Sequence, residues 1–297
     1  MLHLTLRQLQ VFESAARHLS LSRAAEELHL SQPGVSMQLK KLAEAVGHPL
    51  LEQTGKRINL TEQGQELVST AREILGAVVR YEHSLVARRG LSGGSLRIVA
   101  ITTASYFVPR LLGEFSKRHP GVKVFLRVTN REQVLSSLAA GLDDLYILGQ
   151  PPEGLAVTAI PFLKNPLVVL AAPDHPLAGH KAIPVARLAE EPWLLREPGS
   201  GTRLAVERLF ADRGFQLSPR MELGSNEAIK QAVLAGLGIS VVSRHTLSLH
   251  APGQFALLDA EGFPIPRQWY AVYPAGRQRS VVARTFLDFL LSDGTRL

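Results

Sequence analysis

The stretch from Leu21 to Leu42 constrains the fold more than any other part of the chain. It begins with a short run whose apolar residues fall on one face of a helix, and this run ends in a two-residue turn at His29 and Leu30. Ser31 then offers a hydroxyl N-cap, and Pro33 falls in the first helical turn, where a missing N–H has no partner to lose. The stretch therefore predicts two helices joined by a tight turn.

The second of these helices has an apolar and a polar face. The apolar stripe consists of Val35, Leu39, Leu42 and Val46. Gln32, Ser36 and Lys40 lie four residues apart on another face, which is polar and free to enter the major groove of DNA. This is the pattern of a helix-turn-helix whose second helix reads base edges. Small amphipathic helices with surface charges are common, and many of them bind another protein or no ligand at all. The flanking segments are therefore needed to support DNA binding.

These flanking segments favour DNA binding. A helix predicted from about Thr5 to Arg17 has an apolar face that would pack under the other two. Beyond a helix stop at Gly47, the short strands Leu50–Gln53 and Arg57–Leu60 predict a small wing with cationic side chains at its tip. The residues predicted to contact DNA are Gln32, Pro33 and Ser36 at base edges and Arg23, Lys40, Lys56 and Arg57 at phosphates.

Residues 61–90 predict one long helix. Thr61 can cap it, and Glu62 lies in its first turn, where an acidic side chain is favoured. Apolar residues then recur at spacings that alternate between four and three, the period of a coiled-coil seam. The seam consists of Leu67, Ala71, Ile74, Val78, Tyr81 and Leu85. We interpret it as a dimerisation arm, because a dimer doubles the contacts of one short reading helix. The alternative is an amphipathic helix packed on its own domain.

After a glycine-rich segment at 90–94 the pattern changes to alternating strands and helices. This alternation predicts an α/β module with mainly parallel sheets. One of its helices is expected to open at Thr102 and Thr103 and to run to about His119. Loops that join strand ends to helix starts gather at one edge of such sheets, where ligands bind.

Small polar residues occupy these loops. Free N–H groups and the helix dipole favour an anion at a helix start, although N-capping is the better explanation for any one of these residues alone. Because four such helix starts occur in one module, we predict a site for an anionic ligand. The predicted effector-binding residues are Thr102, Thr103, Thr129, Asn130, Gly201, Thr202 and Asn226.

Composition narrows the classes of function. The net charge of +7 favours anionic partners. Residues 1–90 hold 11 Lys and Arg against 9 Asp and Glu, so the excess positive charge is not concentrated in the predicted DNA-binding part. The chain has no cysteine, and His175 and His180, like His245 and His250, lie five residues apart, so we expect no metal site. Neither a P-loop nor a Ser/His/Asp arrangement is evident, so we expect no enzyme and no cofactor.

Length and hydropathy point to a multidomain protein of the cytoplasm. The 297 residues suffice for two or three domains. We find no apolar run long enough for a transmembrane helix, and the first residues lack the order of a signal peptide. We therefore expect a cytoplasmic protein without a membrane partner.

Several motifs resemble a known family. Ala24–Pro33, followed by Val35-Ser36 and by Leu60–Gly64, resembles the DNA-binding half of LysR-type transcriptional regulators. Gly199–Arg203 and Ala235–Ile239 resemble the effector domain of the same family. The resemblance covers essentially the whole chain.

Three further segments resemble one branch of that family, the regulators of RuBisCO operons for CO2 fixation. They are Leu4–Phe12, Glu52–Lys56 and Arg196–Arg203. The chain departs from the family pattern in the wing, where Leu50–Gln53 replaces a common Leu-Phe-x-Arg, and at Gly34, where alanine is usual. The first departure removes a family phosphate contact, for which Lys56 or Arg57 could substitute.

The resemblance implies a mixed fold: an all-α winged helix-turn-helix and a long linker helix, then two α/β subdomains of periplasmic-binding-protein type. The predicted bounds are 1–60 for the DNA-binding domain, 61–93 for the linker helix and hinge, 94–163 with 268–297 for effector subdomain I, and 164–267 for effector subdomain II. The resemblance also implies a homotetramer built as a dimer of dimers. An effector bound between the subdomains would change its packing and the bending of promoter DNA.

The sequence therefore predicts a transcriptional regulator that binds promoter DNA, a small anionic effector and its own copies, with RNA polymerase as a candidate further partner. The branch resemblance implies a phosphorylated metabolite or NADPH as effector. The alternatives are a LysR-type regulator of an unrelated metabolic operon, a ligand-binding protein of transport type, and an enzyme on solute-binding-like domains, as in porphobilinogen deaminase. That enzyme holds its cofactor through cysteine, which this chain lacks.

Overall fold

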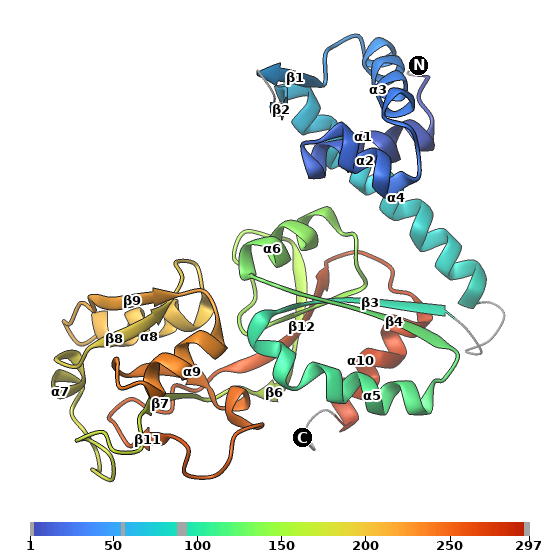
Figure 1. The fold of residues 1–297 in the computed structure, drawn as a ribbon. Helices are drawn as coiled ribbons and strands as arrows, with labels where there is room; N and C mark the ends of the chain where they lie inside the picture. The colour runs from blue at the N-terminus through green and yellow to red at the C-terminus, as the bar shows by residue number, and fades with distance from the viewer. Residues whose placement is uncertain (1–2, 55–56, 88–93, 294–297) are drawn as a thin grey trace. The chain divides into compact units, whose positions relative to one another are not determined.

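The computed structural model describes residues 3–54, 57–87 and 94–293, and the chain divides into two compact units (Figure 1). Unit 1 comprises Met1–Leu85 with Ala140–Leu142, and unit 2 comprises Val86–Ala139 with Asp143–Leu297. None of the described helices combines the length with the apolar composition that crossing a membrane requires.

Unit 1 begins with the three helices that the sequence predicts. They are α1 (Leu6–His18), α2 (Leu21–Leu28) and α3 (Gln32–Val46). A hydroxyl caps each helix, because the side chains of Thr5, Ser20 and Ser31 accept the backbone N–H of the residue three positions on. Helix α3 ends at Gly47, whose φ of +80° is a conformation that glycine adopts without strain.

The apolar faces of these helices meet in one core. Val35 and Leu42 of α3 are fully buried there, together with Leu9 and Phe12 of α1. The apolar stripe predicted for α3 is therefore its buried face. Burying that stripe turns the opposite, polar face of α3 outward.

A two-stranded wing and a long helix complete unit 1. Strand β1 (Leu51–Thr54) pairs antiparallel with β2 (Arg57–Leu60), and α4 (Glu62–Ala87) follows with 26 residues. Gly64 lies so close to the backbone that a β-carbon there would meet the carbonyl oxygen of Leu50 at 2.0 Å. Glycine at this position therefore permits α4 to begin directly beside the base of the wing.

The predicted seam of α4 lies in two environments. Ala71 is fully buried in the core of unit 1, and Leu67 and Ile74 pack against that core. The alternative interpretation, an amphipathic helix packed on its own domain, thus describes the first half of α4. Farther along, Val78 is half-buried and Tyr81 is 64% exposed. The side chain of the last seam residue, Leu85, lies outside the described part of the chain.

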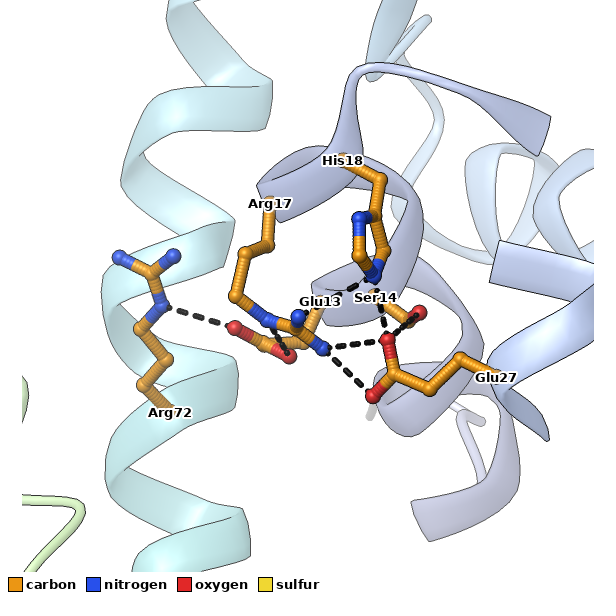
Figure 2. Close-up of polar contacts among 6 residues, drawn as sticks. All are labelled: Glu13, Ser14, Arg17, His18, Glu27 and Arg72. Atoms are coloured by element: carbon orange, nitrogen blue, oxygen red, sulfur yellow. Dashed lines mark hydrogen bonds and ion pairs between the residues drawn. The ribbon is translucent and has the colours of Figure 1, made fainter. Parts of the chain in front are cut away.

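A network of charged side chains joins α1, α2 and α4 (Figure 2). Glu13 of α1 pairs with Arg72 of α4 at 3.3 Å and with Arg17 at 3.4 Å. Arg17 pairs in turn with Glu27 of α2 at 2.6 Å, and Glu27 also contacts His18. Burial alone would raise the pKa of Glu27, but hydrogen bonds from Arg17 and His18 outweigh it and hold the pKa below its ordinary value. The network therefore favours the ionised carboxylate.

The first sheet of unit 2 has five strands in the order β4-β3-β5-β12-β6. The strands are β3 (Gly94–Ile101), β4 (Val122–Thr129), β5 (Leu145–Leu148), β6 (Val157–Lys164) and β12 (Gln268–Pro274). The helices that cover it are α5 (Val108–Arg118) and α10 (Val281–Asp293) on one face and α6 (Arg131–Ala140) on the other (Figure 1). Neighbouring residues of β3 point to opposite faces, Ile98 toward α5 and Val99 toward α6.

The second half of unit 2 is built on two smaller sheets. They contain β7 (Leu167–Ala171) between β10 (Ser240–Ser243) and β11 (Ala256–Leu258), and β8 (Trp193–Arg196) beside β9 (Pro219–Leu223). The helices of this half are α7 (Val185–Ala189), α8 (Gly201–Ala211) and α9 (Asn226–Leu234). Two short 3-10 segments, η1 (Thr102–Tyr106) and η2 (Arg244–Leu247), come from the two halves and touch each other.

The expectation of mainly parallel sheets is wrong. Strand β3 is parallel to β4 and β5, and β8 is parallel to β9. However, β12 is antiparallel to β5 and β6, and β7 is antiparallel to β10 and β11. The chain leaves the first sheet after β6 and re-enters it in β12, so this returning strand is not part of a βαβ unit and pairs antiparallel.

The helix predicted from Thr102 to about His119 is also broken. Thr102–Tyr106 forms the 3-10 segment η1, and Phe107, with φ −133° and ψ −31°, separates it from α5. Pro109 lies in the first turn of α5, where its missing N–H is tolerated. One continuous helix would have needed that N–H, so the break falls before it.

Two chain crossings connect the halves of unit 2. The outward crossing runs from Lys164 at the end of β6 to Leu167 at the start of β7, and the return crossing passes Arg267 into β12. The backbone N–H of Asn165 donates to the carbonyl oxygen of Arg267 at 2.7 Å. The two crossings therefore lie side by side.

Candidate functional sites

The polar face of α3 is exposed to solvent. Gln32, Ser36 and Lys40 are all exposed along it, as is Pro33 at its start. Lys40 approaches Glu44 at 4.0 Å, but both side chains are largely exposed, so this pair contributes little. The structure thus leaves these side chains available to a partner, as a helix that reads a groove requires.

The cations predicted to hold phosphates belong to three elements of unit 1. Arg23 is exposed in the first turn of α2, and Lys40 is exposed on α3. Arg57 begins β2. The side chain of Arg57 and the whole of Lys56 lie outside the described residues.

In unit 2, a pocket lies between the two halves. We call it the arginine pocket after Arg131, which begins α6, Arg196, which ends β8, and Arg267, which directly precedes β12. The described residues that line it are Ile101, Thr102, Thr103, Arg131, Gly149, Gln150, Asn165, Leu167, Arg196, Glu197, Ser200, Gly201, Thr202, Arg267 and Trp269.

Arg196, at the end of β8, is only 4% exposed and is held on several sides. Its Nη1 donates to Oδ1 of Asn226 at 2.6 Å, and its Nε and Nη2 donate to the Glu197 carboxylate at 2.7 and 2.8 Å. Its Nη2 also reaches Oγ1 of Thr102 at 3.4 Å, and Nδ2 of Asn226 donates to Oγ1 of Thr103 at 3.3 Å. These bonds join η1 to the second half of unit 2.

Arg131 and Arg267 carry charge that no carboxylate of the pocket neutralises. Arg131 Nη1 donates to the carbonyl oxygen of Gln150 at 3.0 Å. Arg267 Nη2 donates to the carbonyl oxygen of Gly149 at 3.0 Å and to Oε1 of Gln150 at 2.9 Å. Burial lowers the pKa of both guanidinium groups, and the charge of Arg131 lowers that of Arg267 further. Arginine stays protonated in proteins, so a bound anion would be stabilised here.

The start of α8 adds neutral donors to the same pocket. Its N-cap residue, Ser200, makes no side-chain hydrogen bond to the helix, so the first N–H groups of this 11-residue helix keep their donor capacity. Gly201 and Thr202 place those groups in the pocket wall. Another wall residue, Trp269, is fully buried and its Nε1 has no hydrogen-bond partner within the described structure. The pocket therefore combines cations with the free N–H donors of a helix start.

Four of the seven predicted effector residues line the pocket: Thr102, Thr103, Gly201 and Thr202. Asn226 lies behind it and holds Arg196. Asn130 accepts the backbone N–H of Gln133 at 2.9 Å and so acts as an N-cap.

Thr129 makes a hydrogen bond to the side chain of Gln133. Neither Thr129 nor Asn130 is among the described residues of the pocket wall. At Asn130 the structure agrees with the alternative of local capping, whereas Thr129 bonds only the side chain of Gln133.

Sequence reasoning missed the three arginines. A signal was present for two of them: Arg131 directly follows the predicted pair Thr129 and Asn130, and Arg196 begins the segment that resembles the RuBisCO branch. Arg267 lies in a crossing for which no local motif exists. Among the described residues, no group of three or more His, Cys, Asp or Glu gathers as a metal would require.

Family models match both units. The model of the bacterial regulatory helix-turn-helix protein, lysR family, matches residues 6–65. The model of the LysR substrate binding domain matches residues 89–294. Together they account for the predicted reading helices and for the two-halved module with its pocket.

Individual proteins are similar over nearly the whole chain. The RuBisCO operon transcriptional regulator of Acidithiobacillus ferrooxidans is 50% identical over 98% of this chain and 94% of its own length. The HTH-type transcriptional activator CmpR of Synechocystis is 48% identical over 97% of this chain and 95% of its own. The regulatory domain of Synechocystis CcmR, solved in complex with 2-PG, is 52% identical with a TM-score of 0.64, over 67% of this chain and 96% of that chain. The chain therefore belongs to the LysR family of DNA-binding transcriptional regulators.

Proposed function

We propose that this chain controls a CO2-fixation operon in response to a small phosphorylated metabolite bound in the arginine pocket. The relative from Acidithiobacillus ferrooxidans is named as a RuBisCO operon regulator, and the CcmR regulatory domain was solved with 2-PG. The observation that carries the proposal is the convergence of Arg131, Arg196 and Arg267 on one pocket. Guanidinium groups match phosphate oxygens in pairs of parallel hydrogen bonds.

In this proposal the ligand phosphate lies between Arg131, Arg267 and the start of α8. Gly201 and Thr202 donate backbone N–H groups to it, and the Thr202 hydroxyl donates a further hydrogen bond. The dipole of α8 adds to the attraction. Arg196 is committed to Glu197 and Asn226, so it positions the wall and contributes charge. We leave Thr129 and Asn130 out of the contact set.

A metabolite of the 2-PG type is the first candidate effector, and NADPH is the second. Both carry phosphate groups that the arginines and the helix start could bind. We ascribe a recognition role to the pocket and no catalytic step. Because the pocket wall comes from both halves of unit 2, a ligand that fits one closure of these halves better than another would shift the equilibrium between them.

On DNA, we propose that Gln32, Pro33 and Ser36 contact base edges. The proposed phosphate contacts are Arg23, Lys40, Lys56 and Arg57. Phosphate contacts would set the register of α3 in the major groove, and base contacts would supply the sequence preference.

Two copies are needed to place two reading helices on one promoter. We propose that the second half of α4, with Val78, Tyr81 and Leu85, forms the dimer contact, because the first half already packs in the core of unit 1. A homotetramer in the cytoplasm that contacts RNA polymerase at the promoter completes the proposal.

The proposal is tested by anisotropy titration of the full chain with labelled DNA. One duplex carries the sequence upstream of the RuBisCO genes of the same genome, and the control duplex is the same sequence shuffled. We expect at least about a hundredfold preference for the first at physiological salt. We also expect 2-PG to change the affinity for the first duplex and not for the second.

Each part of the proposal can fail separately. Equal affinity for the two duplexes would contradict control of a CO2-fixation operon and favour another metabolic operon. A clear preference that 2-PG leaves unchanged would contradict the 2-PG class of effector, and the same titration with NADPH then tests the second candidate.

A further inference from the structure

A second pocket lies on the other side of the crossing that leaves the first sheet. Tyr106 of η1, Arg110 of α5, Lys164 of the outward crossing, and Arg244 and His245 of η2 contribute to its wall. We call this the crossover pocket. Its cavity volume of about 550 Å³ gives it room for a metabolite.

The crossover pocket is cationic. Arg110, Lys164, Arg244 and His245 line it, and none of its described wall residues is acidic. No described carboxylate lies within ion-pair distance of Arg110, Lys164 or Arg244. Three permanent positive charges thus line one space whose described wall holds no carboxylate, although the charge of Arg110 also interacts with Glu114 outside it. An anion would stabilise this arrangement.

One wall of this pocket is rigid and aromatic. His245 Nε2 donates to the carbonyl oxygen of Lys164 at 2.8 Å, which fixes the ring. The ring also packs on Phe107, with centroids 5.3 Å apart, and Phe107 packs on Trp269 at 4.9 Å. The guanidinium groups beside this fixed wall provide directed N–H donors as well as charge.

The two pockets share their dividing wall. Along the extended outward crossing, Lys164 and Pro166 line the crossover pocket, whereas Asn165 between them lines the arginine pocket. Ser243 Oγ donates to Oδ1 of Asn165 at 2.6 Å, and the crossover residue Arg244 follows directly. The 3-10 segment η1 likewise gives Thr102 and Thr103 to one pocket and Tyr106 to the other.

We propose that the crossover pocket is a second anion-binding site, separate from the arginine pocket and not required by the function proposed above. Its ligand class is a small metabolite with two or more negative charges on phosphate or carboxylate groups. Arg110, Lys164 and Arg244 supply the charge, and the fixed ring of His245 shapes the wall beside them. A ligand here contacts the sequence neighbours of residues that line the arginine pocket.

The experiment is calorimetric titration of the full chain with inorganic pyrophosphate at constant ionic strength. The double variant Arg110→Ala/Arg244→Ala removes two cations of the crossover pocket, and Arg131→Ala/Arg267→Ala removes two of the arginine pocket. The matched control is Arg208→Ala/Arg220→Ala, which removes two exposed arginines elsewhere in unit 2. We expect the crossover variant to lose one binding event, or to weaken it about tenfold or more, while the control keeps the wild-type isotherm.

Two results would overturn the proposal. One is an isotherm of Arg110→Ala/Arg244→Ala that equals that of the wild type. The other is an equal loss in the control pair, which would show an effect of net charge alone. Arg110 and Arg244 are exposed, and Lys164→Gln, also at an exposed position, gives an independent second variant. Since Arg131→Ala/Arg267→Ala is titrated separately, failure of the arginine pocket to bind leaves this test intact.

Discussion

The polar face of α3 and the arginine pocket are built in opposite ways. The face of α3 takes its side chains from one helix, Gln32 to Lys40, and leaves them exposed. The arginine pocket takes Arg131, Arg196 and Arg267 from distant parts of unit 2 and holds each of them with hydrogen bonds. In the proposed function, DNA reading would depend on the packing of one helix against its core, whereas effector sensing would depend on how the two halves of unit 2 are arranged.

This difference explains where each site is sensitive to substitution. A side chain on the α3 face can be replaced without disturbing the core, because the stripe behind it carries the packing. A pocket arginine cannot be replaced so freely, since its loss leaves carbonyl and amide acceptors without a donor. The predictions below test this contrast in order of decreasing effect.

The largest effect is expected where the reading helices are held. Replacing Gly64 with alanine forces a β-carbon against the carbonyl oxygen of Leu50, so we expect unit 1 to lose about 3 kcal/mol of stability or more. Denaturant unfolding of the full chain, followed by circular dichroism, measures it. Gly113→Ala in α5 is the control, because its β-carbon meets open space and should stabilise by about 0.5–1 kcal/mol. Equal stability of the two variants would contradict the close approach at Gly64.

The next effect is expected in the pocket. Arg267→Ala removes a half-buried cation and the donor to Gly149 and Gln150, so the affinity for 2-PG should fall about a hundredfold. Calorimetry of the full chain measures this loss, and the melting temperature of the variant shows whether the pocket still folds. Arg208→Ala, an exposed arginine of α8, should bind 2-PG as the wild type does. A loss shared by both variants would remove Arg267 from the site.

The DNA face should respond more weakly to the loss of one charge. Lys40→Ala removes one proposed phosphate contact, so the slope of log K against log salt should flatten by about 0.9 units. Anisotropy titrations across a salt series measure the slope, and Lys123→Ala, an exposed lysine of unit 2, serves as control. An unchanged slope for Lys40→Ala would place this side chain away from the DNA.

The smallest effect concerns the network in Figure 2. The pKa of Glu27 is held below its ordinary value in the folded chain, so this contribution is present above the unfolded pKa of about 4.5 and is lost as pH falls through the folded pKa. Glu27 is 40% exposed, so we expect less than about 1 kcal/mol. Melting temperatures between about pH 3 and pH 6 should show the advantage of the wild type over Glu27→Gln shrinking toward acid. A constant difference would contradict the shift.

The same contrast explains what could be predicted from the sequence. The helices of unit 1, their caps and the exposed Gln32, Ser36 and Lys40 follow from local spacing, because helix geometry fixes which residues share a face. The pocket does not follow from spacing. At the start of α6, Asn130 caps the helix, whereas the next residue, Arg131, lines the pocket. The local sequence does not distinguish these two roles, because they depend on the tertiary fold.

Long-range topology set a second limit. The antiparallel return of β12 depends on the two crossings between the halves of unit 2, which leave no periodic signal in the sequence. Arg267 lies in one of these crossings, so neither its sequence neighbours nor its charge indicated that it would line the pocket. The role of the α4 seam could not be predicted from its spacing either. Ala71 is buried within unit 1, so the first half of the seam packs inside its own domain and is not available for a dimer contact.

The central claim is that reading and sensing use separate residues of one chain. It is tested most directly by operator affinity, with and without 2-PG, for Thr202→Ala and Ser36→Ala in the full chain. The account predicts that Thr202→Ala binds the operator as the wild type does but no longer responds to 2-PG. It predicts that Ser36→Ala loses preference for operator over shuffled DNA and still responds. A normal response of Thr202→Ala, together with equal losses of Ser36→Ala on both DNAs, would contradict it.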